Sequence, residues 1–171
     1  MKVLFVLNAF GPASGAEHVL IDFLKTAPEI EPLFLHIGPV KPEINEFLQV
    51  ASPEDCCYVE INTSIMSPLS RQWFMKPIRA DLCRRIKTSK VFKNLLKKTF
   101  ELVYFNNSFE AASFYPLFEN SKTIVHIHDM VDMFRPAHKK CVLKACEKAG
   151  RILTASDACR KMLIKNRIDS S

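Results

Sequence analysis

Short apolar segments alternate with helical segments along almost the whole chain, and this alternation limits the folds that the chain can adopt. Six segments have the length and apolar character of buried parallel strands: Lys2–Leu7, Pro32–Ile37, Cys57–Ile61, Leu102–Phe105, Thr123–Ile127 and Arg151–Thr154. Helices are predicted between or after them, over Ala16–Lys25, Pro42–Val50, parts of Ser67–Phe100, Phe109–Phe118, Ala137–Lys148 and Ser156–Lys165. Strands separated by helices favour a parallel sheet with helices on both faces. We therefore predict a single α/β domain with a doubly wound sheet.

Length and composition also suit one globular domain. The chain has 171 residues, of which 48% are apolar. The apolar run after Lys2 ends at Asn8 after about five residues, below the roughly 7–15 of a signal peptide, and no run reaches the roughly 18–20 apolar residues of a membrane-spanning helix. The six cysteines form no C-x-x-C pair and have no metal-ligand spacing. We interpret them as reduced thiols, several of them in the core, of a cytoplasmic protein.

The loop after the first strand contains two of the four glycines, Gly11 and Gly15, in the stretch GPASGAE. Ligands of doubly wound sheets bind where strand carboxyl ends meet helix N-termini. Glycine permits a positive φ and close approach of a ligand, and the free N–H groups of a helix start favour a phosphate. The G-x-x-x-G-A spacing matches neither the dinucleotide nor the P-loop fingerprint, so a plain strand-to-helix turn stays open as an alternative. Glu17 lies in the first helical turn, where the helix dipole stabilises a carboxylate.

Polar residues end two later strands and are expected at the same sheet edge. His126 and His128 alternate onto one side of their strand, with Asp129 directly after them. An H-x-H pair can bind a divalent ion, but no carboxylate cluster accompanies it, so an imidazole that contacts a sugar or acts catalytically is favoured over a metal site. A purely structural role of these histidines stays open as a further alternative.

The segment Asn106–Ser108 follows the fourth strand and offers groups suited to hydroxyls. Its simpler role is to cap the next helix, and Ser156 is a good N-cap for the last one. Both are therefore helix caps first and ligand contacts second.

Basic residues concentrate in one segment. Arg71–Lys98 holds ten Lys and Arg residues against Asp81 alone, which gives +9, whereas the whole chain carries +6. Two interpretations fit: a solvated helix face packed on the sheet through Val91, Leu95 and Leu96, or an amphipathic Ser89–Phe100 helix that docks on an anionic membrane. Nucleic acid is not an expected partner, because the segment lacks interleaved surface aromatics and any known binding module.

Four segments together resemble glycosyltransferase family 4, specifically the N-terminal half of its GT-B arrangement of two facing Rossmann-like domains. They are MKVLFVLNAFGPASGAEHVLIDFLK, ELVYFNNS, KTIVHIHDM and ACEKAGRILTASDACRKMLI, in the family's order and spacing. The resemblance covers nearly the whole chain and is weakest over Gly38–Lys98. It implies that residues 1–171 form one Rossmann-like, acceptor-side domain without the second, nucleotide-sugar domain.

The resemblance implies an enzyme of polysaccharide biosynthesis that moves a hexosyl-type sugar from a nucleotide-diphosphate sugar to a saccharide or lipid-linked acceptor. The family works with retention and without a metal or other cofactor, and its first domain mainly holds the acceptor while the glycine turn faces the donor phosphates. By the same resemblance His128 is the catalytic residue near the transferred sugar. Substrate binding is expected from Gly11, Ser14, Gly15, Ala16, Glu17, Asn106, Asn107, Asp129 and Ser156.

The sequence departs from the family at the turn and at its end. Ser14 stands where the first of two glycines usually lies, and His18 replaces the usual arginine. The paired glutamates of the second domain have no counterpart here. We therefore expect the isolated domain to be inactive, with the missing domain as its partner, in the cytoplasm or peripherally at the inner membrane face.

Two alternatives from other classes remain open at this point. One is a stand-alone Rossmann-like module that binds a nucleotide or regulates without catalysis. The other is a metal hydrolase that uses His126, His128 and Asp129.

Overall fold

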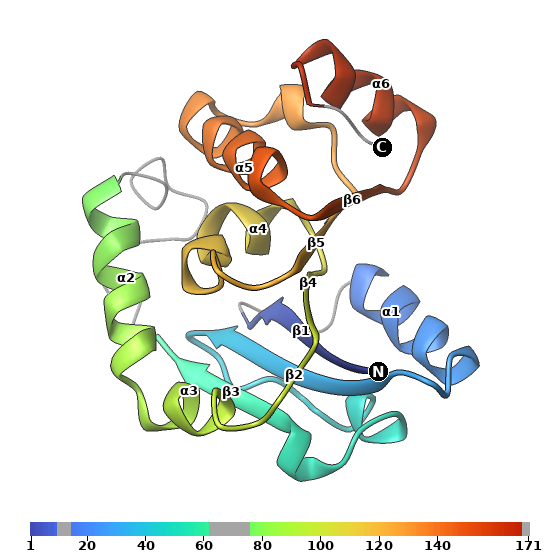
Figure 1. Cartoon of the computed structure of the whole chain (residues 1–171), viewed down its shortest axis with the longest axis vertical. Coiled ribbons are helices and arrows are strands. Elements are labelled where there is room, and N and C mark those ends of the chain that lie inside the picture. The colour runs from blue at the N-terminus through green and yellow to red at the C-terminus, as the bar shows by residue number, and fades with distance from the viewer. Residues whose placement is uncertain (10–14, 62–75, 169–171) are drawn as a thin grey trace.

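Six strands form one parallel sheet in the computed structural model of the chain, which describes residues 1–9, 15–61 and 76–168 (Figure 1). Along the chain they are β1 (Lys2–Asn8), β2 (Glu31–Gly38), β3 (Cys56–Glu60), β4 (Leu102–Phe105), β5 (Thr123–Ile127) and β6 (Arg151–Thr154). Their spatial order is β3-β2-β1-β4-β5-β6, and every neighbouring pair is parallel. The order reverses between β1 and β4, and ligands of doubly wound sheets bind at such a reversal.

Helices pack on both faces of this sheet, so the predicted fold class is confirmed (Figure 1). On one face, called face A below, α1 (Gly15–Thr26) packs on β1 and β2. On the other, face B, lie α2 (Lys76–Thr88), α3 (Lys90–Leu95), α4 (Ser108–Phe114) and α5 (Pro136–Lys148). The last helix, α6 (Asp157–Lys165), follows β6 and packs its buried side into the core of face B.

Side chains alternate between the two faces along each strand, which divides the core into two clusters. The larger cluster, on face B, joins the inward residues of α2 to α6 with strand residues that include Leu4, Val6, Val103, Phe105, Val125 and Ile127. The smaller cluster, on face A, joins α1 to Val3, Phe5, Leu7 and Phe34. Helix α1 therefore covers only the β1–β2 half of face A.

The helices begin and end for local reasons that the sequence shows in part. Asn107 caps α4, where its Oδ1 accepts bonds from the N–H groups of Phe109 and Glu110 at 2.8 and 3.3 Å. Ser156 caps α6, as expected, and its Oγ accepts from the N–H of Cys159 at 3.2 Å. The predicted helix over Phe109–Phe118 ends as an α-helix at Phe114 and continues as a 3₁₀ turn, because Pro116 has no N–H to donate.

Two helix predictions are wrong. The segment Pro42–Val50 contains only the 3₁₀ turn Phe47–Gln49, in which Phe47 alone is buried. One apolar contact does not offset the cost of nucleating a longer helix.

The predicted Ser89–Phe100 helix is also shorter than expected. Helix α3 ends at Leu95 and packs through Phe92 and Leu95, whereas Val91 and Leu96 are exposed. The predicted contacts of Val91 and Leu96 with the sheet are therefore wrong, because residues three apart share a face of so short a helix.

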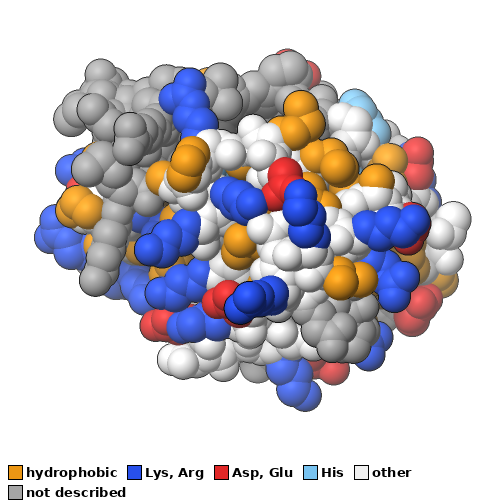
Figure 2. Space-filling view, turned by 90° about the horizontal axis from the view of Figure 1, so that it is seen from above, with side chains coloured by type: hydrophobic (Ala, Val, Ile, Leu, Met, Phe, Trp, Pro, Cys, Tyr) orange, Lys and Arg blue, Asp and Glu red, His pale blue; other side chains and the backbone are white. Residues whose placement is uncertain are grey.

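All six cysteines lie among the described residues and are free thiols, and Cys83, Cys141, Cys146 and Cys159 are buried. Within the described ranges, no helix combines the length and apolarity that crossing a membrane requires. Lys and Arg side chains are spread over the α6 end of the molecule, with Asp and Glu side chains among them (Figure 2). Basic side chains are thus not confined to the segment before β4.

Candidate functional site

The polar segments picked out from the sequence follow strands that end at one edge of the sheet. The register pairs Val6 of β1 with Phe105 of β4, and Phe105 with Val125 of β5. Asn106 and His128 follow these strands, so they lie at the carboxyl edge next to the end of β1. This edge is the reversal point of the strand order, which makes it the expected ligand site of the fold.

The turn between β1 and α1 is described only at its two ends. Gly11 and Ser14 lie outside the described residues. Gly15 opens α1 without a positive φ, and a Cβ added to it would meet nothing within 4 Å. Among the described residues, the helix therefore starts at Gly15 with open space beside the backbone, and Ala16 and the buried Glu17 follow in its first turn.

A buried carboxyl group that the sequence analysis missed joins β1 to α4. Oε1 of Glu110 accepts bonds from the backbone N–H and the side-chain amide of Asn8, at 3.0 and 2.6 Å. Burial, with a smaller contribution from Glu17, raises the pKa of Glu110 to about 8. Since the side chain is fully buried, Glu110 keeps its proton at neutral pH.

The sequence analysis also missed a close contact that shapes the end of β1. A Cβ on Gly38 would lie 2.0 Å from the carbonyl oxygen of Ala9. In addition, the N–H of Ala9 donates to the carbonyl of Ile37 at 2.9 Å, and Ala9 accepts from the N–H of Val40 at 3.2 Å. Only glycine at position 38 lets the two strand ends approach in this way.

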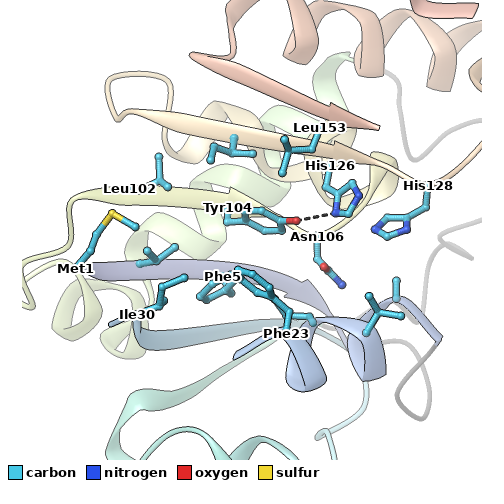
Figure 3. A pocket seen from close by; sticks show the side chains of 15 residues that line it. Met1, Phe5, Phe23, Ile30, Leu102, Tyr104, Asn106, His126, His128 and Leu153 are labelled. Atoms are coloured by element: carbon cyan, nitrogen blue, oxygen red, sulfur yellow. Dashed lines mark hydrogen bonds between the residues drawn. The ribbon is translucent and has the colours of Figure 1, made fainter. Parts of the chain in front are cut away.

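Two imidazole rings stand side by side on face A at the end of β5 (Figure 3). The ring centroids of His126 and His128 are 3.9 Å apart, and the hydroxyl of Tyr104 lies 2.6 Å from Nδ1 of His126. Burial, with help from His128, lowers the pKa of His126 to about 4, and burial raises that of Tyr104 to about 12. Both groups are neutral at pH 7, and the hydrogen bond between them fixes the ring of His126.

A groove of about 350 Å³ runs along face A from these rings toward the N-terminus of the chain. Its walls come from α1, β1, β4, β5 and β6, and Figure 3 shows Asn106 and His128 at one end with Met1 and Leu102 at the other. Asn106 is 2% exposed. Its Nδ2 atom and Nε2 of His128 are both buried without a hydrogen-bond partner in the described structure. Unpaired buried donors of this kind are costly unless a ligand or water satisfies them.

Three predicted site residues have structural partners of their own. Asn107 and Ser156 serve as the helix caps described above. Asp129 is exposed, and its Oδ2 accepts from the hydroxyl of Ser108 at 2.6 Å. The structure therefore places Ala16, Asn106 and His128 on one groove, and leaves Asn107, Asp129 and Ser156 outside its lining.

The arrangement of His126, His128 and Asp129 does not resemble a metal site. Nδ1 of His126 is engaged by Tyr104, and the Asp129 carboxylate by Ser108. Across the described ranges, no group of three His, Cys, Asp or Glu side chains converges as metal ligands. The unpaired groups at this edge, Nδ2 of Asn106 and Nε2 of His128, suit hydroxyl groups of a ligand better than a cation.

Comparison with known proteins was informative only for structure. No protein-family model matches the chain, and no curated protein sequence matches it. Among solved structures, HepE of Anabaena in complex with UDP matches 99% of this chain and 42% of its own length, with 16% identity and a TM-score of 0.57. UGT89C1 of Arabidopsis thaliana, complexed with UDP, matches 98% of the chain and 50% of its own length, with 12% identity and a TM-score of 0.54.

A third match is a protein from Listeria monocytogenes assigned as a UDP-N-acetylglucosamine 2-epimerase. It matches 99% of the chain and 43% of its own length, with 11% identity and a TM-score of 0.56. The chain thus spans half or less of the length of these proteins. At such identities the likeness is one of fold, and it confirms the predicted Rossmann-like fold, which these proteins contain within a longer chain.

Proposed function

We propose that the chain is the acceptor-side domain of a glycosyltransferase that moves a sugar from a nucleotide-diphosphate sugar to an acceptor. The transfer proceeds with retention and without a metal ion, and it needs a second domain that holds most of the nucleotide. Two of the matched structures, in complex with UDP, share this fold and support the proposal.

The observation that carries the proposal is the pair of unsatisfied groups at the carboxyl edge. Nδ2 of Asn106 and Nε2 of His128 are buried without partners in the described structure, beside the helix start at Gly15. Hydroxyl groups of a sugar satisfy such groups, and the open space at Gly15 lets a phosphate oxygen approach the first N–H groups of α1.

His128 acts at the transferred sugar in this account. Its ring lies beside that of His126 at an interplanar angle of 40°, and Tyr104 holds His126 in place. Nε2 of His128 is then available to bond a sugar hydroxyl. We therefore assign His128 to orient the sugar, with Asn106 beside it.

One alternative class keeps a specific observation in its favour. One matched structure is assigned as a UDP-N-acetylglucosamine 2-epimerase and not as a glycosyltransferase, so the fold alone does not favour glycosyl transfer. A stand-alone module that binds a nucleotide without transferring a sugar would use the same helix start, but it would gain nothing from groups that bond sugar hydroxyls.

A calorimetric titration of the purified chain with UDP-glucose, UDP and glucose distinguishes the two functions. The proposal predicts that UDP-glucose binds more tightly than UDP. Replacing His128 by Ala should weaken UDP-glucose about fivefold and leave UDP unchanged, because one hydrogen bond contributes about 1 kcal/mol. Asn94→Ala, on the exposed side of α3, is the matched control and should change neither.

Equal affinity for UDP and UDP-glucose would instead favour the nucleotide-binding module. The chain alone is expected to produce no glucose from UDP-glucose, since the second domain is needed. Steady release of glucose from UDP-glucose by the chain would contradict that part of the proposal.

A further inference from the structure

Basic residues of α2 and α5 have no part in the site at the carboxyl edge. Arg79 lies on α2, within the basic segment before β4, and Lys144 and Lys148 lie on α5. Both helices pack beside α4 on face B, on the opposite side of the sheet from the groove (Figure 1). The three side chains line one pocket of about 210 Å³ between these helices. Basic side chains from distant parts of the chain therefore converge on one pocket.

A proline after α4 determines where the guanidinium of Arg79 lies. In a continuous α-helix the carbonyl of Ala112 would accept from the N–H of residue 116, but Pro116 has no N–H. Nη1 of the half-buried Arg79 supplies that bond at 3.3 Å and also lies 2.7 Å from Sγ of Cys141 on α5. Burial raises the pKa of this thiol, so it is a neutral partner. The guanidinium is thus held through one nitrogen, and within the described residues its Nε and Nη2 carry no hydrogen bond.

The cations around the pocket are not neutralised by neighbouring carboxylates. Arg79, Lys144 and Lys148 form no ion pair with any described residue. Glu119, which is exposed, is the one carboxylate among the described lining residues. Three cations against one carboxylate give the pocket a net charge of +2. A concave site lined mainly by one sign of charge concentrates the opposite ion, so this pocket attracts an anion.

The floor of the pocket is apolar and consists of small side chains. Ala111, Ala112 and Ala145 are buried, and Pro116 lies next to them. An inorganic anion alone would leave this floor in contact with water, whereas an apolar group of a few carbons would cover it. The volume of about 210 Å³ is below the roughly 300–1,000 Å³ of pockets for drug-sized ligands. The pocket therefore suits a small ligand that has an anionic group and an apolar part.

The charge of the pocket also distinguishes between anionic groups. A carboxylate carries one negative charge, whereas a phosphate monoester carries about −1.5 to −2 at neutral pH and has three acceptor oxygens. The planar fork of an arginine matches two phosphate oxygens, and a lysine binds phosphate as a point charge. One guanidinium with two unused nitrogens and two ammonium groups therefore match a phosphate monoester in charge and in number of donors.

We propose that this pocket binds a small phosphate monoester. Its phosphate lies between Arg79, Lys144 and Lys148, and its organic part lies on the alanines of α4. The start of α1, Asn106 and His128 take no part, so the site is separate from the carboxyl edge and does not depend on the proposed function.

Calorimetric titration of the purified chain with propyl phosphate, inorganic phosphate and propan-1-ol tests the site. Propyl phosphate should bind saturably and at least about fourfold more tightly than inorganic phosphate, because burial of a single CH₂ group already has an effect of that size. Propan-1-ol, which lacks the anionic group, should not bind saturably. An excess of UDP should not displace propyl phosphate, since the nucleotide is proposed to bind at the other site.

Two variants and a matched control locate the binding. Arg79→Gln should weaken propyl phosphate about tenfold, because a charged hydrogen-bond donor is lost. Lys144→Ala should weaken it about threefold, and this variant should fold whatever the effect of Arg79→Gln on stability, since Lys144 is exposed. Lys140→Ala is the control, because Lys140 is an exposed lysine of the same helix that does not line the pocket, and the affinity should not change.

Four results would overturn the proposal. The first is the absence of saturable binding of propyl phosphate, also in a chain that binds UDP-glucose, which would leave the proposed function intact. The second is equal affinity for propyl phosphate and inorganic phosphate, which would indicate an adventitious ion only. The third is equal weakening in Lys144→Ala and Lys140→Ala, which would indicate a general effect of positive charge. The fourth is displacement by UDP with full affinity retained in Arg79→Gln, which would assign the phosphate to the carboxyl edge.

Discussion

Glu110 and Asn8 connect the ends of β1 and α4 through a single carboxyl oxygen, which accepts two hydrogen bonds from Asn8. The other oxygen, Oε2, is buried without a partner in the described structure, and it carries the proton that burial retains. Glu110 therefore acts at neutral pH as a neutral group that fixes the strand end. The stability of the chain should therefore depend on pH through the ionisation of Glu110.

Replacing Glu110 by Gln should stabilise the chain at high pH. The pKa of Glu110 is about 8 in the folded chain and 4.5 in the unfolded one, so between these values the folded state holds the extra proton. The wild-type free energy of unfolding therefore falls as pH rises from about 4.5 to 8. Gln keeps the bonds to Asn8 and removes this loss, which is on the order of a few kcal/mol.

Urea unfolding at pH 4.5 and pH 8 measures this effect. The two proteins should have similar stability at pH 4.5, with Glu110→Gln clearly more stable at pH 8. Glu43→Gln is the control, because Glu43 is exposed and should show no such difference. A constant difference between wild type and Glu110→Gln at both pH values would show that Glu110 is ionised in the fold.

Some residues at the carboxyl edge of the sheet could be predicted from the sequence and others could not, for a physical reason. His126, His128 and Asn106 directly follow apolar strands, so local alternation places them. Glu110 lies in a helical turn, where a carboxylate is normally exposed. Its burial depends on Asn8, which is 102 positions away in the chain, and no local pattern contains that contact.

The short helices of this fold depend for their stability on capping and on packing against neighbouring elements. Helix α4 has seven residues, and Asn107 supplies acceptors for two of its first N–H groups. A helix of this length is not stable by itself, so the cap and the packing of α4 on β1 and α5 hold it. The same rule explains why Pro42–Val50, which has no side-chain cap bond and buries only Phe47, forms only one 3₁₀ turn.

Asn107→Ala should lower the free energy of unfolding by about 1–2 kcal/mol, because the side chain caps α4 and Ala cannot. Asn94→Ala serves as the control, since Asn94 is exposed within α3 and alanine favours a helix. Chemical denaturation of both variants measures the difference. If Asn107→Ala is as stable as Asn94→Ala, the cap contributes nothing, and Asn107 is free to contact a ligand.

Substitution by alanine is expected to have different effects on stability at Gly38 and at Gly15. Gly38→Ala should destabilise the chain strongly or prevent folding, because the added Cβ would lie 2.0 Å from the carbonyl oxygen of Ala9. Gly15→Ala should leave stability unchanged or slightly raised, since no described residue lies within 4 Å of the added atom. Thermal unfolding of the two variants measures this contrast, and equal stability of the two would contradict the close approach of β2 to Ala9.

For the molecule as a whole, the order of strands and helices in the sequence was sufficient to predict the sheet. The bounds of β4, β5 and β6 are those predicted, because these strands are short, apolar and flanked by clear helix signals. The groove on face A was not predictable in this way. It results from α1 covering only β1 and β2, and that depends on the spatial order of strands, which the sequence does not state.

The proposed function requires that the carboxyl edge of this sheet binds a nucleotide sugar, with its phosphates at the start of α1 and its sugar at Asn106 and His128. A map of backbone amide shifts in the ¹⁵N-labelled chain, titrated with UDP-glucose, tests it most directly. Wild type should show saturating shifts at Gly15, Ala16, Asn106 and His128, and Gly15→Ala should keep its stability while losing them. Saturating shifts confined to other parts of the chain, or none at millimolar UDP-glucose, would contradict the claim.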